Sequence, residues 1–288
     1  MKTITSLFIL SIFLFLNANA QTYQTGNQIN VQVMDNSPEK AFTNYIALDI
    51  LGSDFDWDFR TPAVYAGING RWDLTSNLTL EGAFRPTYSF YGDKKWGLTT
   101  EANVYYPFNS KTIEKEIKVV TGFSQESDLT TKTSTTKFFN TDGDMLRRHG
   151  ARGGLFYKRS GMQSDAVYPV DTRITQAGIF IGLQQTRQAL LKTKINNEYI
   201  RYGAGFTRIY ADFMLLPGSG IADEQVEQNN EKSRAYGYRV GMQFYVNPHN
   251  GEYKLWGASM LNAEIGSLPY IGFYVTVGYA IAIYNRKK

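Results

Sequence analysis

The sequence predicts an all-β fold: a transmembrane, antiparallel, up-and-down β-barrel of about 12 strands. Apolar and polar residues alternate through most of the chain, aromatic residues gather at the ends of the alternating runs, and an apolar leader precedes them. Because successive side chains of a strand point to opposite faces, this alternation gives each strand one apolar and one polar face. A soluble β-sandwich alternates in the same way, so further evidence must decide which face meets water.

Residues 1–20 have the plan of a secretory signal peptide. Lys2 precedes an apolar core, and an A-x-A cleavage site, LNANA, precedes Gln21. The core is shorter than the roughly 20 apolar residues that a spanning helix needs. We therefore expect an exported protein whose mature chain begins near Gln21. A retained N-terminal anchor is the alternative.

The composition narrows the classes of function. The chain has no cysteine, which excludes disulfides and thiolate metal sites. Its formal net charge of +4 is too small to indicate a nucleic-acid-binding protein. Aromatic residues make up 15% of the chain, and the mean hydropathy is −0.33. A barrel with a hydrated interior can be polar on average, because every second residue faces water.

The chain divides into three parts: the signal peptide, a flexible periplasmic segment over 21–43, and a single barrel domain over 44–288. The alternating runs predict strands near 44–51, 62–73, 78–90, 96–107, 116–127, 129–140, 147–158, 172–184, 198–214, 235–247, 253–266 and 270–285.

The links between these runs predict an orientation. Tight turns are expected at 74–77 and 247–251, and longer polar links at 52–61, 159–171 and 215–234. If the first strand rises from the periplasm, both tight turns are periplasmic and the 215–234 link is outside, as in bacterial barrels. The 185–196 link is long for a periplasmic turn.

The run LTLEGAFRPTYSF at 78–90 shows the two faces. Leu78, Leu80 and Phe84 share one register, while Glu81 and Arg85 share the other. Trp and Tyr prefer the headgroup level of a membrane, where the ring meets lipid and the polar tip meets water. We expect the apolar face to contact lipid, with an aromatic girdle formed by Trp72, Tyr88, Phe90, Trp96 and Tyr106.

The polar registers also contain full charges, which would line the lumen of a barrel. The candidates are Arg71, Glu81, Arg85, Glu101, Arg148, Arg152, Arg239 and Glu264. In a soluble sandwich the same side chains would form a solvated outer face. In a barrel they form either a constriction or a network that plugs the lumen, which is narrow at about 12 strands.

With its leader, alternating strands, aromatic strand ends and amphipathic last strand, the chain resembles the Gram-negative outer-membrane β-barrel proteins. The resemblance covers almost all of the mature chain. It implies localisation in the outer membrane and contact with outer-membrane lipid.

Catalytic and metal-binding patterns are weak. Several outer-membrane lipid hydrolases use an H-x-S pattern, but His149 is followed by Gly150-Ala151 and His249 by Asn250-Gly251. Oxygen ligands for calcium occur in GSDFDWDF (Asp54, Asp56, Asp58) and NTDGD (Asp142, Asp144), but neither run has EF-hand spacing. Solvated loop acids or turn formers are the simpler interpretation. The sequence predicts no enzyme activity, cofactor or metal.

Three functions remain as hypotheses. The first is a non-enzymatic binding or structural barrel, such as an accessory subunit of an envelope transport, secretion or assembly system, in contact with other envelope proteins through its outer loops. The second is a narrow channel for small polar solutes. The third, which lacks its motif, is a lipid-modifying enzyme. No nucleic-acid partner is expected.

Overall fold

The computed structural model describes residues 31–40, 44–56, 61–89, 96–127, 132–163, 171–196, 199–221, 235–246 and 259–286. Over these residues the fold is all-β, and the single helical element is a 3-10 turn, η1 (Pro38–Lys40). No helix in these ranges has the length and apolar character needed to cross a membrane. The signal peptide predicted at 1–20 lies outside the described residues.

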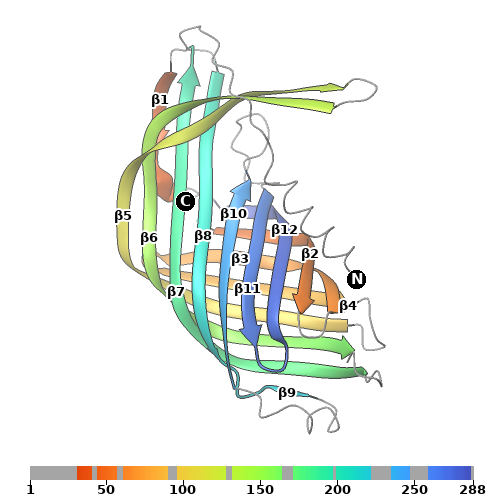
Figure 1. Cartoon of the computed structure of the whole chain (residues 1–288). Coiled ribbons are helices and arrows are strands. Elements are labelled where there is room, and N and C mark those ends of the chain that lie inside the picture. Colours follow the sequence, from red (N-terminus) through yellow and green to blue (C-terminus); the bar gives the residue numbers. More distant parts are fainter. Residues whose placement is uncertain are drawn as a thin grey trace.

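The strands, shown in Figure 1, are β1 (Val31–Asn36), β2 (Asn44–Asp56), β3 (Thr61–Thr75), β4 (Leu78–Ser89), β5 (Trp96–Ser127), β6 (Lys132–Gln163), β7 (Asp171–Ile195), β8 (Tyr199–Leu215), β9 (Gly220–Ile221), β10 (Tyr236–Val246), β11 (Ser259–Leu268) and β12 (Gly272–Arg286).

Ten of these strands close into an antiparallel barrel in the order β2–β3–β4–β5–β6–β7–β8–β10–β11–β12, with β12 pairing back onto β2. The stagger of the strands can be measured by stepping from each residue to its partner on the next strand. Starting at Asp73 of β3, these steps go once around the ring and return to Thr61 of the same strand, so the strands are staggered by 12 positions (73 − 61). With usual strand dimensions this stagger corresponds to a tilt of about 40°. Closure leaves the barrel without a free edge.

The expected strand number of about 12 is wrong, because two pairs of predicted strands are continuous. The runs 96–107 and 116–127 form the single strand β5, and 129–140 and 147–158 form β6. The polar stretches between them resemble loops, yet they pair with each other from Ser110↔Arg148 to Glu116↔Asp142. Pairing satisfies the backbone of both stretches without apolar alternation. A bulge between Pro107 and Asn109 accompanies the transition.

The long strands β5, β6, β7 and β8 continue beyond the barrel and rise above it on one side (Figure 1). We call this part the extension: residues 109–127 of β5, 132–145 of β6, 189–195 of β7, 199–205 of β8, and β1. The rest of the ring is the barrel body. The 185–196 stretch, expected to be a long link, continues β7 instead, so the connection to β8 spans only the residues between Ile195 and Tyr199.

β1 completes the sheet of the extension. β6 leaves β7 after Met145↔Ala189, and β1 takes the freed edge, from Asn36↔Leu191 to Val31↔Ile195. The described part of the 21–43 segment, expected to be a flexible lead-in, is therefore paired into the sheet.

The barrel body is apolar outside, and its interior combines polar and charged side chains with two buried apolar clusters, one around Phe156, Phe180 and Met214 and one around Tyr45, Phe206 and Met260. Along β4, Thr79 and Glu81 are buried, whereas Leu80 and Phe84 are 45% and 51% exposed. The outward register of β7 is similar, with Ile179, Ile181 and Leu183 all more than half exposed. The inward register contains polar or charged side chains on every ring strand. On β12 these are Tyr274 and Thr276, next to the small residues Ala280 and Ala282.

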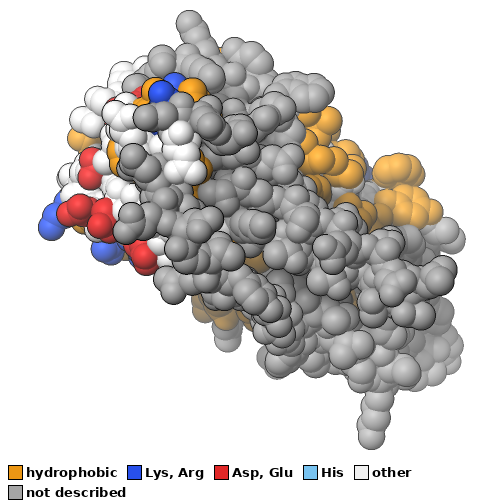
Figure 2. Space-filling model, turned by 90° about the horizontal axis from the view of Figure 1, so that it is seen from above, with side chains coloured by type: hydrophobic (Ala, Val, Ile, Leu, Met, Phe, Trp, Pro, Cys, Tyr) orange, Lys and Arg blue, Asp and Glu red, His pale blue; other side chains and the backbone are white. Residues whose placement is uncertain are grey.

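The extension has a different arrangement. The β5–β6 hairpin crosses β7 and β8 (Figure 1), and Ile117, Val119 and Leu191 form a buried apolar cluster with Ala189 between them. The exposed positions of β5 here are charged or polar: Lys111, Thr112, Glu114, Lys115, Glu116 and Lys118. On β1 and β8, the apolar side chains of Val33, Met34 and Ile200 are also exposed. In Figure 2, acidic and basic side chains gather on the side where β5 lies, and hydrophobic side chains on the opposite side.

Candidate functional site

The interior of the barrel body holds the largest group of charged side chains. All eight predicted lumen residues lie in the inward register: Arg71, Glu81, Arg85, Glu101, Arg148, Arg152, Arg239 and Glu264. They reach this position because each occupies the polar register of a strand whose other register is apolar.

Four of the interior charges form a closed cycle. Arg239 donates from Nε to Asp212 Oδ2 at 2.7 Å and from Nη1 to Glu101 Oε2 at 2.7 Å. Arg152 donates to the other oxygen of Glu101 and lies 3.4 Å from Asp212 Oδ1. β5, β6, β8 and β10 each supply one member, so the cycle ties together strands from well-separated parts of the ring. Two carboxylates balance two guanidinium groups, as a water-poor interior requires.

Aromatic rings and a fifth charge surround this cycle. The guanidinium of Arg152 lies 4.1 Å from the ring centroid of Tyr210, and that of Arg239 lies 4.6 Å from that of Phe180. Glu264 accepts hydrogen bonds from the hydroxyls of Tyr210 and Tyr274 and lies 3.4 Å from Arg239 Nη1. Cation–π contacts and charge-assisted hydrogen bonds to carboxylates hold the guanidinium groups in place.

A second cluster lies around Glu81. Its carboxylate lies 2.9 Å from Arg208 Nη1 and 3.7 Å from Arg71 Nη1. Gln184 joins the two clusters, because its amide donates to Glu81 at 3.1 Å and accepts from Arg152 at 3.2 Å. One connected network, which we call the interior network, therefore spans β3, β4, β5, β6, β7, β8, β10 and β11. Its charged members are Arg71, Asp73, Glu81, Glu101, Arg152, Arg208, Asp212, Arg239 and Glu264.

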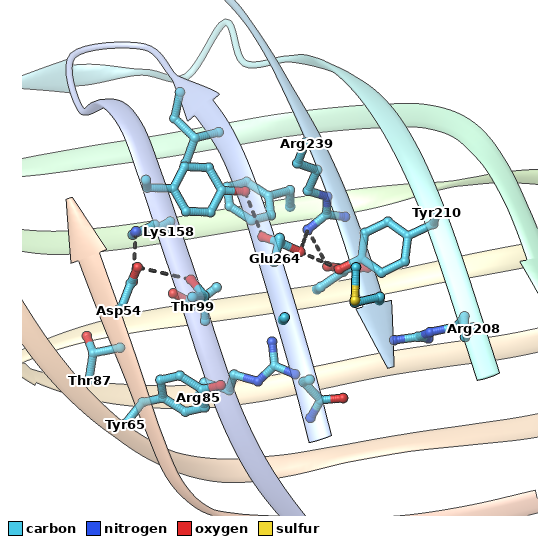
Figure 3. A pocket seen from close by; sticks show the side chains of 18 residues that line it. Asp54, Tyr65, Arg85, Thr87, Thr99, Lys158, Arg208, Tyr210, Arg239 and Glu264 are labelled. Atoms are coloured by element: carbon cyan, nitrogen blue, oxygen red, sulfur yellow. Dashed lines mark hydrogen bonds and ion pairs between the residues drawn. The ribbon is translucent and has the colours of Figure 1, made fainter. Parts of the chain in front are cut away.

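Two further ion pairs lie on the β2 side of the interior. Asp49 binds Arg85 at 2.9 Å and accepts from the Asn69 amide at 2.7 Å. Asp54 binds Lys158 at 2.8 Å and accepts from Thr276 at 3.1 Å. Figure 3 shows Lys158 pointing toward Asp54 and, nearby, Arg239, Tyr210 and Glu264 converging.

Sequence reasoning missed six members of these ion pairs: Asp49, Asp54, Asp73, Lys158, Arg208 and Asp212. A signal existed in β8, where Arg208, Tyr210 and Asp212 alternate with apolar neighbours. Asp54, interpreted from sequence as a loop acid or calcium ligand, is instead a buried member of a strand.

Little space remains between these side chains. The cavity lined by Asp54, Arg85, Glu101, Arg239 and Glu264 has a volume of about 50 Å³. That is room for only a few water molecules. Among the described residues, no group of three or more His, Asp or Glu side chains is arranged to hold a metal ion.

The predicted girdle residues that the structure describes, Trp72, Tyr88, Trp96 and Tyr106, lie in the outward register. Trp96 and Tyr106 are 66% and 54% exposed, and Tyr88 packs edge-to-face on Trp96 with 5.1 Å between the ring centroids. Trp72 is partly exposed on β3, and Phe90 lies outside the described residues.

His149 also faces outward, on β6. It pairs with Asn109 and Gln185, and the groove that it lines contains no serine. His249 and Asp58 lie outside the described residues. Asp142 and Asp144 are strand residues of β6, and the backbone N–H of Asp144 donates to Asn36.

These features define a class: a closed, ten-stranded antiparallel β-barrel with an ion-paired interior and an apolar exterior. No profile of a known protein family matches the chain, and no curated protein sequence is significantly similar to it.

Proposed function

We propose that this protein is an integral outer-membrane β-barrel without enzymatic activity. Its lumen is closed by the interior network, and it acts as a binding or structural subunit of an envelope transport, secretion or assembly system. The barrel body lies in the membrane and the extension lies in the periplasm.

The main support for the proposal is that the barrel body exposes many large apolar side chains and buries many of its charged ones. Large apolar side chains are exposed around the whole ring, from Leu48 and Ile68 to Leu155, Phe213 and Val240. Burying one such side chain is worth about 1.5–3 kcal/mol relative to water, and soluble monomers rarely expose apolar patches above a few hundred Å². The hydrocarbon core of a membrane would solvate these exposed apolar side chains better than water does. Because the ring is closed, its backbone groups are paired within the sheet, as hydrocarbon requires.

The dimensions of the barrel body agree with a bilayer. β10 has 11 residues and β4 has 12. At about 3.4 Å per residue and a tilt of about 40°, an 11-residue strand rises about 28 Å. The hydrocarbon core of a membrane is about 30 Å thick, and the apolar band of outer-membrane barrels is about 25 Å tall.

The connections support the orientation. β2 begins and β12 ends at the end of the barrel from which the extension rises, and the two-residue turn between β3 and β4 lies at the same end. The 20-residue interval between β8 and β10 lies at the opposite end. Short turns on the periplasmic side are typical of bacterial barrels, which supports a periplasmic position of the extension.

The closed lumen favours binding over conduction. A channel for small polar solutes would need the cycle of Glu101, Arg152, Asp212 and Arg239 to open, yet each charge in it has at least two partners. The extension offers a charged, solvent-exposed β-surface, and such a surface suits a protein partner better than lipid.

Three measurements on the purified protein test the proposal. We expect faster gel migration before boiling than after, and flotation with phospholipid vesicles that survives carbonate washing. We also expect no current steps in planar bilayers. A protein that stays in solution with its apolar wall covered by another sheet contradicts the membrane assignment. Steady current steps would support the channel instead.

The periplasmic partner is tested separately. Cross-linkers placed at the exposed extension residues Thr112 and Glu116 should capture a protein in intact cells. Cross-linkers at Ile181, on the barrel wall, serve as the matched control and should capture lipid or nothing. Equal capture at both places, or capture at neither, contradicts a partner bound at the extension.

A further inference from the structure

We infer that the outer wall of the barrel carries a phospholipid site. A row of three cations binds the phosphate of the headgroup, and an apolar groove beside the row takes an acyl chain. The inference depends on the proposed membrane location and adds to it one specific lipid contact.

The row consists of Lys111, Arg147 and Arg187 on β5, β6 and β7. Lys111 pairs directly with Arg147, and Arg147 pairs directly with Arg187, so the three side chains stand next to each other on the outward face. None of them forms an ion pair with a described residue, in contrast to the paired arginines of the interior. Like charges directly opposite each other on neighbouring strands destabilise a sheet. A bound anion would remove this repulsion.

Gln185 holds two of the cations together. With its amide oxygen turned toward the guanidinium groups, it accepts from Arg187 Nε at 2.7 Å, from Arg187 Nη2 at 3.0 Å and from Arg147 Nε at 3.0 Å. An arginine has five N–H donors, so both side chains keep donors for a further acceptor. Both arginines are only partly buried and Lys111 is exposed, so an anion has access to them. Paired guanidinium groups bind phosphate oxygens through two parallel hydrogen bonds.

The apolar groove begins one row away, toward the middle of the barrel. It has a volume of about 440 Å³ and is bounded by His149, Gln185 and the exposed side chains of Phe108, Leu183, Ile209 and Val240. Ala211 lies in its floor, opposite Leu183. Along the outward face of β7, the wall therefore changes from apolar at Leu183 to polar at Gln185 and to cationic at Arg187.

This change from apolar to cationic side chains indicates which kind of molecule binds here. In the proposed membrane, the cationic row lies where the apolar band ends on the periplasmic side, which is the headgroup level of the inner leaflet. A glycerophospholipid presents a phosphate followed by acyl chains, which is the same order of anionic and apolar parts that this wall would bind. A free anion would not use the groove, and a neutral lipid would not use the row.

The test measures lipid retention by native mass spectrometry after the protein is purified in detergent and mixed with phosphatidylglycerol or with diacylglycerol, which lacks the phosphate. We expect at least tenfold greater retention of phosphatidylglycerol. The double substitution R147Q/R187Q should abolish that preference. Arg159→Gln is the matched control, because Arg159 is an exposed arginine at the other end of the outward register of β6, and it should leave the preference unchanged.

A second variant separates the groove from the charges. Ala211→Trp fills the groove while the row stays intact, and it should reduce phosphatidylglycerol retention, whereas millimolar inorganic phosphate should not displace the lipid. The inference is overturned if R147Q/R187Q retains phosphatidylglycerol as the wild type does, or if phosphate alone displaces it. Heat-modifiable migration, measured on the same samples, reports separately on the barrel. A protein that inserts but shows no headgroup preference contradicts only the lipid site.

Discussion

The barrel body and the extension share the strands β5, β6, β7 and β8, but these strands bury different side chains in the two regions. On β7, Ile181 is 67% exposed and Gln184 is 2% exposed within the barrel body. Further along the same strand, Leu191 is fully buried beneath the β5–β6 hairpin, while Lys192 and Lys194 are partly exposed. One strand therefore passes from a wall with an apolar exterior to a two-layer sheet with an apolar centre.

Alternation of apolar and polar residues does not by itself reveal which face of a strand meets water. Both regions alternate with a period of two, so both satisfy the same sequence pattern. The burial differs because the small interior of the closed ring holds ion pairs together with apolar clusters, whereas two stacked layers enclose an apolar core. Substitutions that act differently in the two regions can test this contrast.

The largest effect is expected inside the barrel body, for Arg239→Ala. Removing this side chain leaves Glu101, Asp212 and Glu264 without one of their cationic partners. Breaking a buried ion pair by deleting one partner costs about 3–5 kcal/mol. Urea titration of the folded, heat-modifiable form in detergent should show this loss.

Arg159→Ala is the control for that measurement, since Arg159 is exposed on the outward face. Surface substitutions of this kind usually change the free energy of unfolding by less than about 0.5 kcal/mol. A loss below about 1 kcal/mol for Arg239→Ala would mean that the interior network does not stabilise the barrel, because a broken buried pair costs more.

The second effect concerns the wall. Ile181→Arg places a charge in the middle of the apolar stretch of β7, and arginine near the midplane costs a membrane barrel about 2–4 kcal/mol. The same charge introduced by Thr112→Arg, on an exposed position of the extension, should change stability by less than about 0.5 kcal/mol. Folding into vesicles of defined lipid measures both variants. Equal values would remove the distinction between the two surfaces.

Much of the barrel body could be predicted from the sequence, because its strands alternate without interruption. The run at 78–90 becomes β4 over Leu78–Ser89, with Glu81 and Arg85 directed inward as expected. The same pattern holds for Arg152 on β6 and Arg239 on β10. Each of these charges is recognisable because its neighbours on both sides are apolar or small.

The rest could not be predicted, for two physical reasons. Asp49 and Asp54 are an odd number of positions apart, so in a regular strand they would point to opposite faces. Both point inward because the register shifts between Asp49 and Gly52, and the position of such a bulge could not be predicted from the alternation of the sequence. The partner of Arg239 is equally hidden, since Glu101 is 138 positions away along the chain. The extension was missed because its connecting stretches are polar on both faces, which resembles a loop until their mutual pairing is known.

The third effect belongs to the extension. Leu191→Ala removes a fully buried side chain from the cluster with Ile117 and Val119. Replacing a buried leucine by alanine lowers the free energy of unfolding by about 2–5 kcal/mol. We expect a loss near about 2 kcal/mol here, because the neighbours in a small two-layer cluster can move into the space that the side chain leaves. Hydrogen exchange should show faster exchange in residues 117–119 and in β1, with β10 and β11 unchanged. Equal loss of protection in the barrel strands would mean that the two regions unfold as one unit.

The smallest effect is expected from a pair of glycines on the same face of β8. A Cβ at Gly203 would lie 2.7 Å from Ile117 Cγ2, 3.0 Å from Val119 Cγ2 and 3.1 Å from the carbonyl oxygen of Lys118, whereas a Cβ at Gly205 meets nothing within 4 Å. Gly203→Ala should therefore push the hairpin away from β8 and cost about 1 kcal/mol, the lower end of overpacking effects. Gly205→Ala should be neutral or slightly stabilising, because it only restricts the unfolded chain. Exchange rates at residues 117–119 distinguish the two variants. If both variants leave those rates unchanged, the hairpin does not rest on β8, and the apolar centre of the extension would have to be formed without that strand.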